Sequence, residues 1–331
     1  MRRVLVPSHV PDLAPLVPRA AQIVSLTGEA MGTTWSVRLV GPAGLDERPV
    51  RGLIEDRLAL VVRQMSQWES GSDLSRFNRA VAGSSHVLPD AFFHVLRCAL
   101  GIACDTNGAY DPTMGALSEL WGFGAGGPRT DIPSEAEVAS ARERVGWTTL
   151  AIDRERRTAT QPGGLQLDLS SIAKGYAVDL VSDALTLRGF RDHLVEIGGE
   201  LRGSGTKPDQ SPWWVALEDA DGGEGDMIVA LHGISVATSG DARRFIVADG
   251  RKYSHTLDPR TGWPIPDALA SVTVFDRSCM RADALATALS VLGAEDGYAF
   301  AAARNIAARF LLRTPEGVNE SMTPAFADML G

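Results

Sequence analysis

An aspartate and a threonine near the C-terminus have a spacing suited to holding a cation. In MRADALATALSVL (residues 280–292), Asp283 and Thr287 are four positions apart, so on a helix their oxygens share one face. The alanines around them are small, and carboxylate and hydroxyl oxygens are ligands that a hard cation such as magnesium accepts. A polar stripe facing solvent, or a buried aspartate with a protein partner, would explain the same pattern.

A second polar group lies where a predicted strand meets a predicted helix. The stretch LDLSSIAKGYAVD (residues 167–179) places Asp168 after an apolar run, Ser170 and Ser171 at a helix N-terminus, and Lys174 one turn later. Exposed amides at such a corner favour an anionic group, and Lys174 would point to the same region. Gly175 would let another group approach the backbone closely. A capped amphipathic helix with a surface lysine explains the segment equally well.

Two further segments carry glycines, hydroxyls and a candidate base. Gly198 and Gly199 follow a buried strand and fit a ligand against the backbone or, as we prefer, a hairpin or bulge. In SVATSGDARRFIVADGRKYSHTLDPRTG (residues 235–262), Thr238 belongs to a polar corner and His255 stands between hydroxyls before a turn. A lone histidine is usually structural, but one at such a junction is a better candidate for proton transfer.

The elements that must position these residues can be predicted from hydrophobic periodicity. It predicts helices over residues 51–67, 90–106, 171–188, 280–292 and 295–303. It predicts strands over residues 33–40, 149–152, 158–161, 165–169 and 307–312, and several short strands between residues 194 and 274. Residues 69–79 are polar and rich in serine, which indicates a loop. Strands grouped with strands predict an α+β fold with antiparallel or mixed β-sheets flanked by helices.

The ends and the composition of the chain restrict its class. Two arginines and then prolines at positions 7, 11, 15 and 18 do not form a signal peptide. We therefore expect a flexible arm over residues 1–26, a single domain over residues 27–331, and a cytoplasmic protein, or one of the cell envelope if the start is misassigned. No run of 18 apolar residues occurs, so we expect no membrane span. The formal net charge of −9 argues against nucleic acid as a partner.

Taken in order, these segments resemble the ApbE family, the FAD:protein FMN transferases. The likeness also includes Met31-Gly32-Thr33, SDLSRFN (residues 72–78) and YDPTMGALSELWGFG (residues 110–124), and it extends from about residue 31 to residue 303. It implies an ApbE-like fold and a magnesium-dependent transferase. Such an enzyme moves the FMN half of FAD to a Thr or Ser hydroxyl of a target protein through a phosphoester bond and releases AMP.

The resemblance also assigns roles to single residues. Those implied to contact FAD are Met31, Trp68, Ala109, Tyr110, Asp111, Asp168, Lys174 and the backbone near Leu257. Gly198, Gly199 and Thr238 complete the FAD-binding set that we expect. The implied magnesium ligands are Asp283, Thr287 and the main-chain carbonyl of Ser171. The family commonly has tyrosine where this chain has Trp68, and often glycine or alanine where it has Ser171, a change that a main-chain ligand tolerates.

The chemistry expected from these residues agrees with this resemblance. The pyrophosphate of FAD concentrates negative charge, so its displacement needs charge stabilisation and in-line positioning, which magnesium and Lys174 would supply. His255 is our first candidate for the base that takes the acceptor's proton, and a water linked to Asp283 is the second. The alternatives are an FAD pyrophosphatase that passes FMN to water and a flavin-binding protein without turnover. The combination of Lys174, Asp283 and Thr287 argues against pure binding.

Overall fold

An antiparallel sheet of eight strands forms the centre of the molecule. The computed structural model describes residues 3–7, 21–129, 131–221, 223–241, 245–248 and 250–330. The strand order is β16-β15-β14-β11-β8-β7-β3-β2, and every neighbouring pair is antiparallel. These strands are β2 (Ala21–Ala30), β3 (Thr33–Pro42), β7 (His193–Ile197), β8 (Glu200–Ser204), β11 (Ile234–Gly240), β14 (Leu269–Asp276), β15 (Ala307–Thr314) and β16 (Gly317–Met322).

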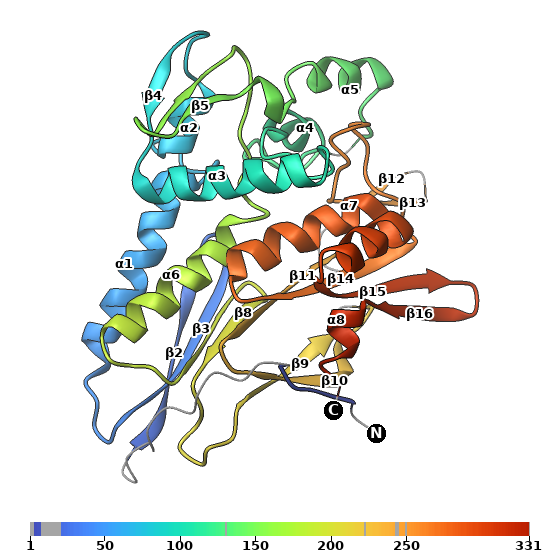
Figure 1. Cartoon of the computed structure of the whole chain (residues 1–331). Coiled ribbons are helices and arrows are strands. Elements are labelled where there is room, and N and C mark those ends of the chain that lie inside the picture. The colour runs from blue at the N-terminus through green and yellow to red at the C-terminus, as the bar shows by residue number, and fades with distance from the viewer. Residues whose placement is uncertain are drawn as a thin grey trace.

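Helices cover one face of this sheet and enclose the main core. Figure 1 shows α6 and α7 lying across the strands, with α1 beside α6 and α3 above α7. Their apolar faces meet those of the strands in one large cluster of buried side chains. The helices of the described chain, of which α8 packs against the opposite face, are α1 (Glu47–Met65), α2 (Asp73–Asn78), α3 (Asp90–Asp105), α4 (Gly115–Leu120), α5 (Glu135–Arg142), α6 (Ala173–Leu187), α7 (Cys279–Ala303) and α8 (Pro324–Ala327), with a 3₁₀ turn at Trp147–Thr149.

A small sheet of three strands covers the opposite face. It has the order β1-β10-β9, with β1 (Arg3–Leu5) parallel to β10 (Glu224–Leu231) and β9 (Trp213–Glu218) antiparallel to it. A second apolar cluster fills the space between the two sheets and includes Leu5, which is fully buried. The two ends of the described chain lie close together (Figure 1), and the Val6 amide donates to the Met329 carbonyl at 2.7 Å.

This arrangement corrects the expectation of a flexible arm over residues 1–26. Residues 3–5 form β1, and residues 21–26 belong to β2, whose side chains Val24 and Leu26 are buried in the main core. The remainder of the expected arm includes residues 8–20, which lie outside the described residues. The composition of residues 1–26 suggested an arm because the strands that pair with this segment lie outside it. β1 pairs with residues 227–229, and β2 pairs with β3.

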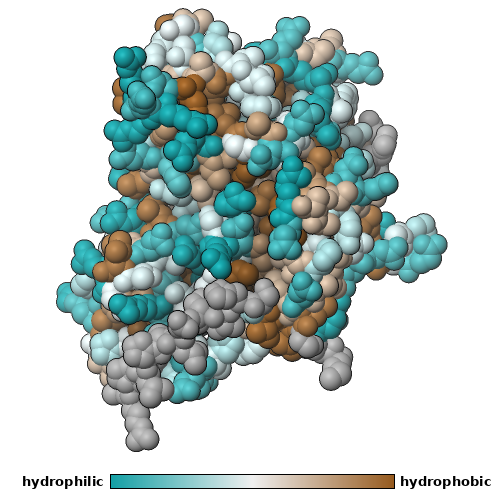
Figure 2. Space-filling model, viewed as in Figure 1, coloured by the Kyte–Doolittle hydropathy of each residue, from teal (hydrophilic) through white to brown (hydrophobic). Residues whose placement is uncertain are grey.

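Short elements above the sheet complete the fold. The strands β4 (Ser85–Val87), β5 (Ala151–Asp153) and β6 (Thr158–Thr160) form one small sheet, and β12 (Phe245–Ala248) and β13 (Arg251–Ser254) form a hairpin. Polar residues are spread over most of the face shown in Figure 2, with apolar residues in smaller patches between them. Within the described parts of the chain, no helix combines the length and apolar character needed to cross a membrane.

The structure confirms the predicted α+β fold and most of its long elements, with three differences. Residues 165–169 form no strand, only a bridge between Gln166 and Met114. Residues 73–78 form α2 instead of a loop, because the Ser72 hydroxyl accepts from the Ser75 amide and caps the helix. Helix α6 begins at residue 173, with Ile172 in the N-cap position and no side-chain cap, so Ser171 lies just outside it.

Candidate active site

A cavity of about 870 Å³ opens where the helices meet one end of the central sheet. Its volume is within the range of sites for large ligands. Twelve of the fifteen residues expected at the site line it: Met31, Trp68, Asp168, Ser171, Lys174, Gly198, Gly199, Thr238, His255, Leu257, Asp283 and Thr287. A smaller cavity of about 370 Å³ adjoins it, since Gly198, Gly199 and Thr238 line both.

Helix α7 presents Asp283 and Thr287 to this cavity, as their spacing predicts. Asp283 is buried, and its Oδ2 accepts from the Gly175 amide at 2.9 Å. Gly175 is the third residue of α6, so its amide has no partner within that helix, and Asp283 supplies one from α7. Ser171 lies just before α6 and lines the same cavity.

Gly175 allows the two helices to approach this closely. A Cβ atom at this position would lie 2.3 Å from the Cys279 carbonyl oxygen and 2.8 Å from the Asp283 Cβ. The sequence indicated that some group would approach the backbone here, and that group is the neighbouring helix.

Lys174 and Glu200 form a buried ion pair beside Asp283. The Lys174 Nζ donates to Glu200 Oε1, while Glu200 Oε2 is buried and has no hydrogen-bond partner among the described residues. Burial opposes the charge on Lys174, but the neighbouring carboxylates Glu200 and Asp283 outweigh it and raise the pKa of the lysine. Burial raises the pKa of Glu200 to about 8, and it also raises the pKa of Asp283. One ammonium thus faces two carboxylates in a buried place, which favours the uptake of further positive charge.

Asp168 and the glycine pair shape the walls of the cavity. Asp168 Oδ1 accepts from the Ser170 amide and hydroxyl at 2.9 and 2.6 Å, and its Oδ2 accepts from the Ser118 hydroxyl at 2.7 Å. Its carboxylate therefore fixes the loop before α6. Gly198 and Gly199 form the two-residue turn between β7 and β8, with φ values of 66° and 105°. This confirms the preference for a hairpin, and the turn also lines the cavity.

His255 and Trp68 lie at other parts of the lining. His255 follows β13, and its ring meets that of Phe123 edge-to-face with centroids 6.2 Å apart. Trp68 follows α1 and is 52% exposed, so a large flat side chain stands at the cavity wall in contact with solvent. Thr238 extends from β11, and its hydroxyl lies 2.9 Å from the Thr273 hydroxyl.

Three residues expected to contact FAD do not line this cavity. Ala109 packs in a buried apolar cluster, and the buried Tyr110 hydroxyl accepts from the Ser171 hydroxyl at 3.2 Å. The Asp111 carboxylate accepts from the Thr113 amide at 2.8 Å and from the Trp147 amide at 3.1 Å. These side chains lie behind the wall of the cavity, where Tyr110 supports Ser171.

The residues around Asp283 suit a hard cation. Their donors are oxygens, which magnesium prefers, and the buried Glu200 Oε2, which has no hydrogen-bond partner among the described residues, adds another oxygen to the same cavity. Among the residues that the structure describes, no group of three or more His, Cys, Asp or Glu side chains could hold a metal ion. A site here would therefore depend on one carboxylate, a hydroxyl and a carbonyl, completed by the ligand's own oxygens.

Sequence reasoning missed Glu200. Its importance depends on β8 lying next to α6, and no local pattern in the sequence reports that pairing. The signal that was available is its position directly after the Gly198-Gly199 turn, where a charged residue begins the next strand.

Comparison with known proteins agrees with the geometry. The model of the ApbE family matches residues 31–310. The FAD:protein FMN transferase of Vibrio cholerae is 37% identical over 315 residues, covering 94% of each chain. The FAD:protein FMN transferase of Haemophilus influenzae is 34% identical, covering 93% of this chain and 92% of the relative.

A solved structure extends this likeness to three dimensions. The apo form of the flavinyl transferase ApbE from Pseudomonas stutzeri superimposes with a TM-score of 0.87 at 42% identity, covering 94% of this chain and 98% of that one. The range matched by the family model includes every segment that lines the cavity. On this agreement of sequence and fold, the chain belongs to the ApbE family.

Proposed function

We propose that this chain is an FAD:protein FMN transferase that depends on magnesium. It moves the FMN half of FAD to a threonine or serine hydroxyl of an acceptor protein, a post-translational flavinylation, and releases AMP. The relatives named above carry out FAD:protein FMN transfer by name, and the cavity of this chain has the groups that such a reaction needs. The observation that carries the proposal is the meeting of Asp283, Ser171 and the Lys174–Glu200 pair in one cavity.

The charge of the site must match a pyrophosphate. Lys174 already donates to Glu200, so the lysine alone is a weak partner for an anion. The ligands that would hold magnesium are Asp283, Thr287 and the Ser171 carbonyl. When bound there, magnesium supplies the positive charge that stabilises the pyrophosphate as its bond breaks. Lys174 stays protonated and contributes a fixed positive charge next to the same group.

The chain's own groups position the reactants and receive the proton. The acceptor oxygen attacks the phosphorus of the FMN half, the bond from that phosphorus to the oxygen of the AMP half breaks, and AMP departs with the electron pair. His255 takes the proton of the acceptor hydroxyl, and a water held by Asp283 is the second candidate for this role. Trp68, Met31 and the Leu257 backbone are the proposed contacts of the dinucleotide along the cavity wall.

Analysis of the products by mass spectrometry tests the proposal. The full chain is incubated with FAD, magnesium and candidate acceptor proteins that carry an exposed threonine or serine. An acceptor that gains the mass of FMN, together with AMP, supports transfer. FMN and AMP without an adduct would favour the pyrophosphatase, and intact FAD would favour the binding protein.

The cytoplasmic location of the reaction stays a prediction, which fractionation of cells expressing the native gene would test.

A further inference from the structure

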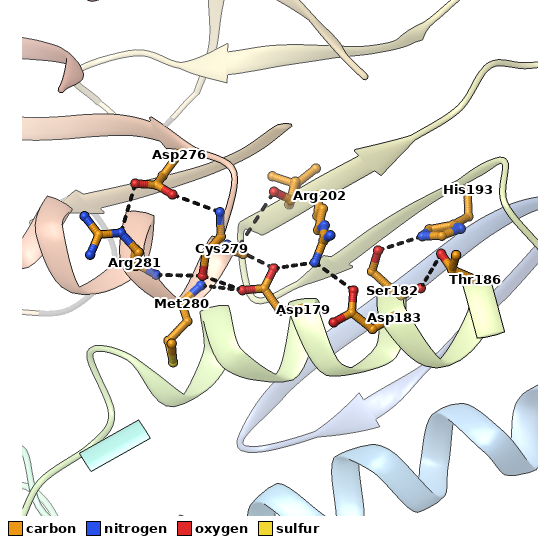
Figure 3. A network of polar contacts seen from close by, with 12 residues as sticks. Asp179, Ser182, Asp183, Thr186, His193, Arg202, Asp276, Cys279, Met280 and Arg281 are labelled. Atoms are coloured by element: carbon orange, nitrogen blue, oxygen red, sulfur yellow. Dashed lines mark hydrogen bonds and ion pairs between the residues drawn. The ribbon is translucent and has the colours of Figure 1, made fainter. Parts of the chain in front are cut away.

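The carboxylate of Asp179, outside the cavity, binds the first turn of α7. Asp179 Oδ1 accepts from the Cys279 amide at 3.0 Å, and Oδ2 accepts from the Met280 amide at 3.0 Å and from the Ser278 hydroxyl at 2.8 Å (Figure 3). The first amides of a helix have no partner within that helix. Asp179 belongs to α6, so one helix supplies acceptors to the N-terminus of another, beside the Ser278 hydroxyl, which caps α7 by accepting from the Arg281 amide. The negative charge of Asp179 also suits the positive end of the helix dipole.

The same carboxylate reaches a third element. Arg202 of β8 donates its Nη1 to Asp179 Oδ1 at 2.9 Å, and it lies 3.1 Å from Asp183 (Figure 3). The Asp179 side chain is only 13% exposed, so these interactions are shielded from solvent. Asp179 thus joins α6, α7 and β8 at one point, with four donors on its two oxygens.

These three elements also carry the charged groups of the cavity. Lys174 is on α6, Glu200 on β8 and Asp283 on α7. Lys174 precedes Asp179 by five residues, Glu200 precedes Arg202 by two, and Asp283 follows the first residue of α7 by four. The contacts around Asp179 therefore lie two to five residues away from the charged groups of the cavity, along the same three elements.

We propose that Asp179 is a positioning residue that sets the place of Asp283, and through it the magnesium affinity of the cavity, by holding the N-terminus of α7. A helix moves nearly as a rigid body over one turn, so a shift at its first amides displaces the carboxylate one turn later. The Gly175–Asp283 hydrogen bond fixes α7 at the cavity, and Asp179 fixes it at its end. The inference rests on the proposed function, because it takes magnesium as the ion that Asp283 binds.

Magnesium titrations of the full chain with saturating FAD and no acceptor protein test this inference. Asp179→Asn keeps the shape and part of the hydrogen bonding, whereas Asp179→Ala removes both acceptor oxygens. We expect the dissociation constant for magnesium, measured by calorimetry, to rise about 10-fold or more in Asp179→Asn, the scale seen for residues that orient metal ligands, and further in Asp179→Ala.

Val229→Ala is the matched control for lost stability. Val229 is fully buried on the other face of the sheet, so its truncation should lower the melting temperature but leave magnesium affinity unchanged. Equal affinity in wild type and Asp179→Asn would overturn the inference alone. A Val229→Ala variant that loses affinity as much as Asp179→Asn would also overturn it, since the effect would then follow stability. Absence of magnesium binding by the wild-type chain would overturn the metal dependence in the proposed function and this inference with it.

Discussion

Replacing Gly175 by alanine should separate α6 from α7 and weaken the site between them. The added Cβ would lie 2.3 Å from the Cys279 carbonyl oxygen and 2.7 Å from its carbon. Ordinary contacts begin at 3.4 Å, so one backbone must move by about 1 Å, because dispersion contacts turn strongly repulsive below that distance. Backbone atoms inside two packed helices have no rotamer to change, in contrast to the end of a flexible side chain.

The expected cost follows from this overlap. Overpacking a well-packed core costs about 1–3 kcal/mol, which should appear as a lower free energy of unfolding in a denaturant titration. The same shift stretches the hydrogen bond from the Gly175 amide to Asp283 Oδ2. A misplacement of about 1 Å can reduce a rate roughly 100-fold, so FMN transfer in single turnover should fall on that scale, with weaker magnesium binding.

Gly101→Ala provides the control. Gly101 lies within α3, is exposed, and has open space where a Cβ would be added. Alanine there should stabilise the chain by about 0.5–1 kcal/mol, since glycine is a poor helix former, and should leave transfer unchanged. If Gly175→Ala has the same free energy of unfolding and the same rate of FMN transfer as the wild type, the close contact of the helices does not define the site and our reasoning is wrong.

Three further predictions concern the base, the buried pair and the N-terminus. His255→Asn should slow transfer about 100-fold or more, the usual contribution of a general base, with near-native magnesium affinity in calorimetry; a native rate would exclude His255 as the base. Burial raises the pKa of Glu200 from its ordinary 4.5 to about 8, so the folded chain should bind more protons than the unfolded one between these values, and the free energy of unfolding without magnesium should fall as the pH rises through this range. Glu200→Gln should flatten that dependence in melts between pH 5 and pH 9, and an unchanged slope would contradict the assignment. Deleting residues 1–26 removes Val24 and Leu26 from the core and should destabilise the chain by about 4 kcal/mol or more, whereas a denaturant midpoint equal to that of the full chain would show that β2 is dispensable.

Local patterns in the sequence were sufficient for the parts of the site that lie on one element. The spacing of Asp283 and Thr287 predicted a helix that carries both to one face, and α7 presents both to the cavity. The Gly198-Gly199 pair predicted a tight turn because both positions need positive φ. The membership in the ApbE family that the ordered motifs suggested is confirmed, because the motifs span the chain and chance agreement over seven of them is improbable.

What the sequence could not provide depends on contacts between distant segments. Glu200 gains its role from Lys174 on another element, and Asp179 gains its role from α7, about 100 residues later. Leu5 seemed part of a proline-rich arm because its strand partner lies more than 200 residues away. Pairing across such separations leaves no periodic signal, since periodicity reports only the faces of single elements.

The central claim, that Asp283 holds the magnesium on which FMN transfer depends, is tested most directly by Asp283→Ala. The measurement is single-turnover transfer from saturating FAD to an acceptor identified by the product analysis, with magnesium titrated and a thermal melt recorded beside it. Asp283 is the one carboxylate in the proposed ligand set, so its loss should weaken magnesium binding sharply and slow transfer about 100-fold or more in a chain that stays folded. A folded Asp283→Ala variant that transfers FMN at a near-native rate at low magnesium would contradict the account, because the metal site would then lie elsewhere.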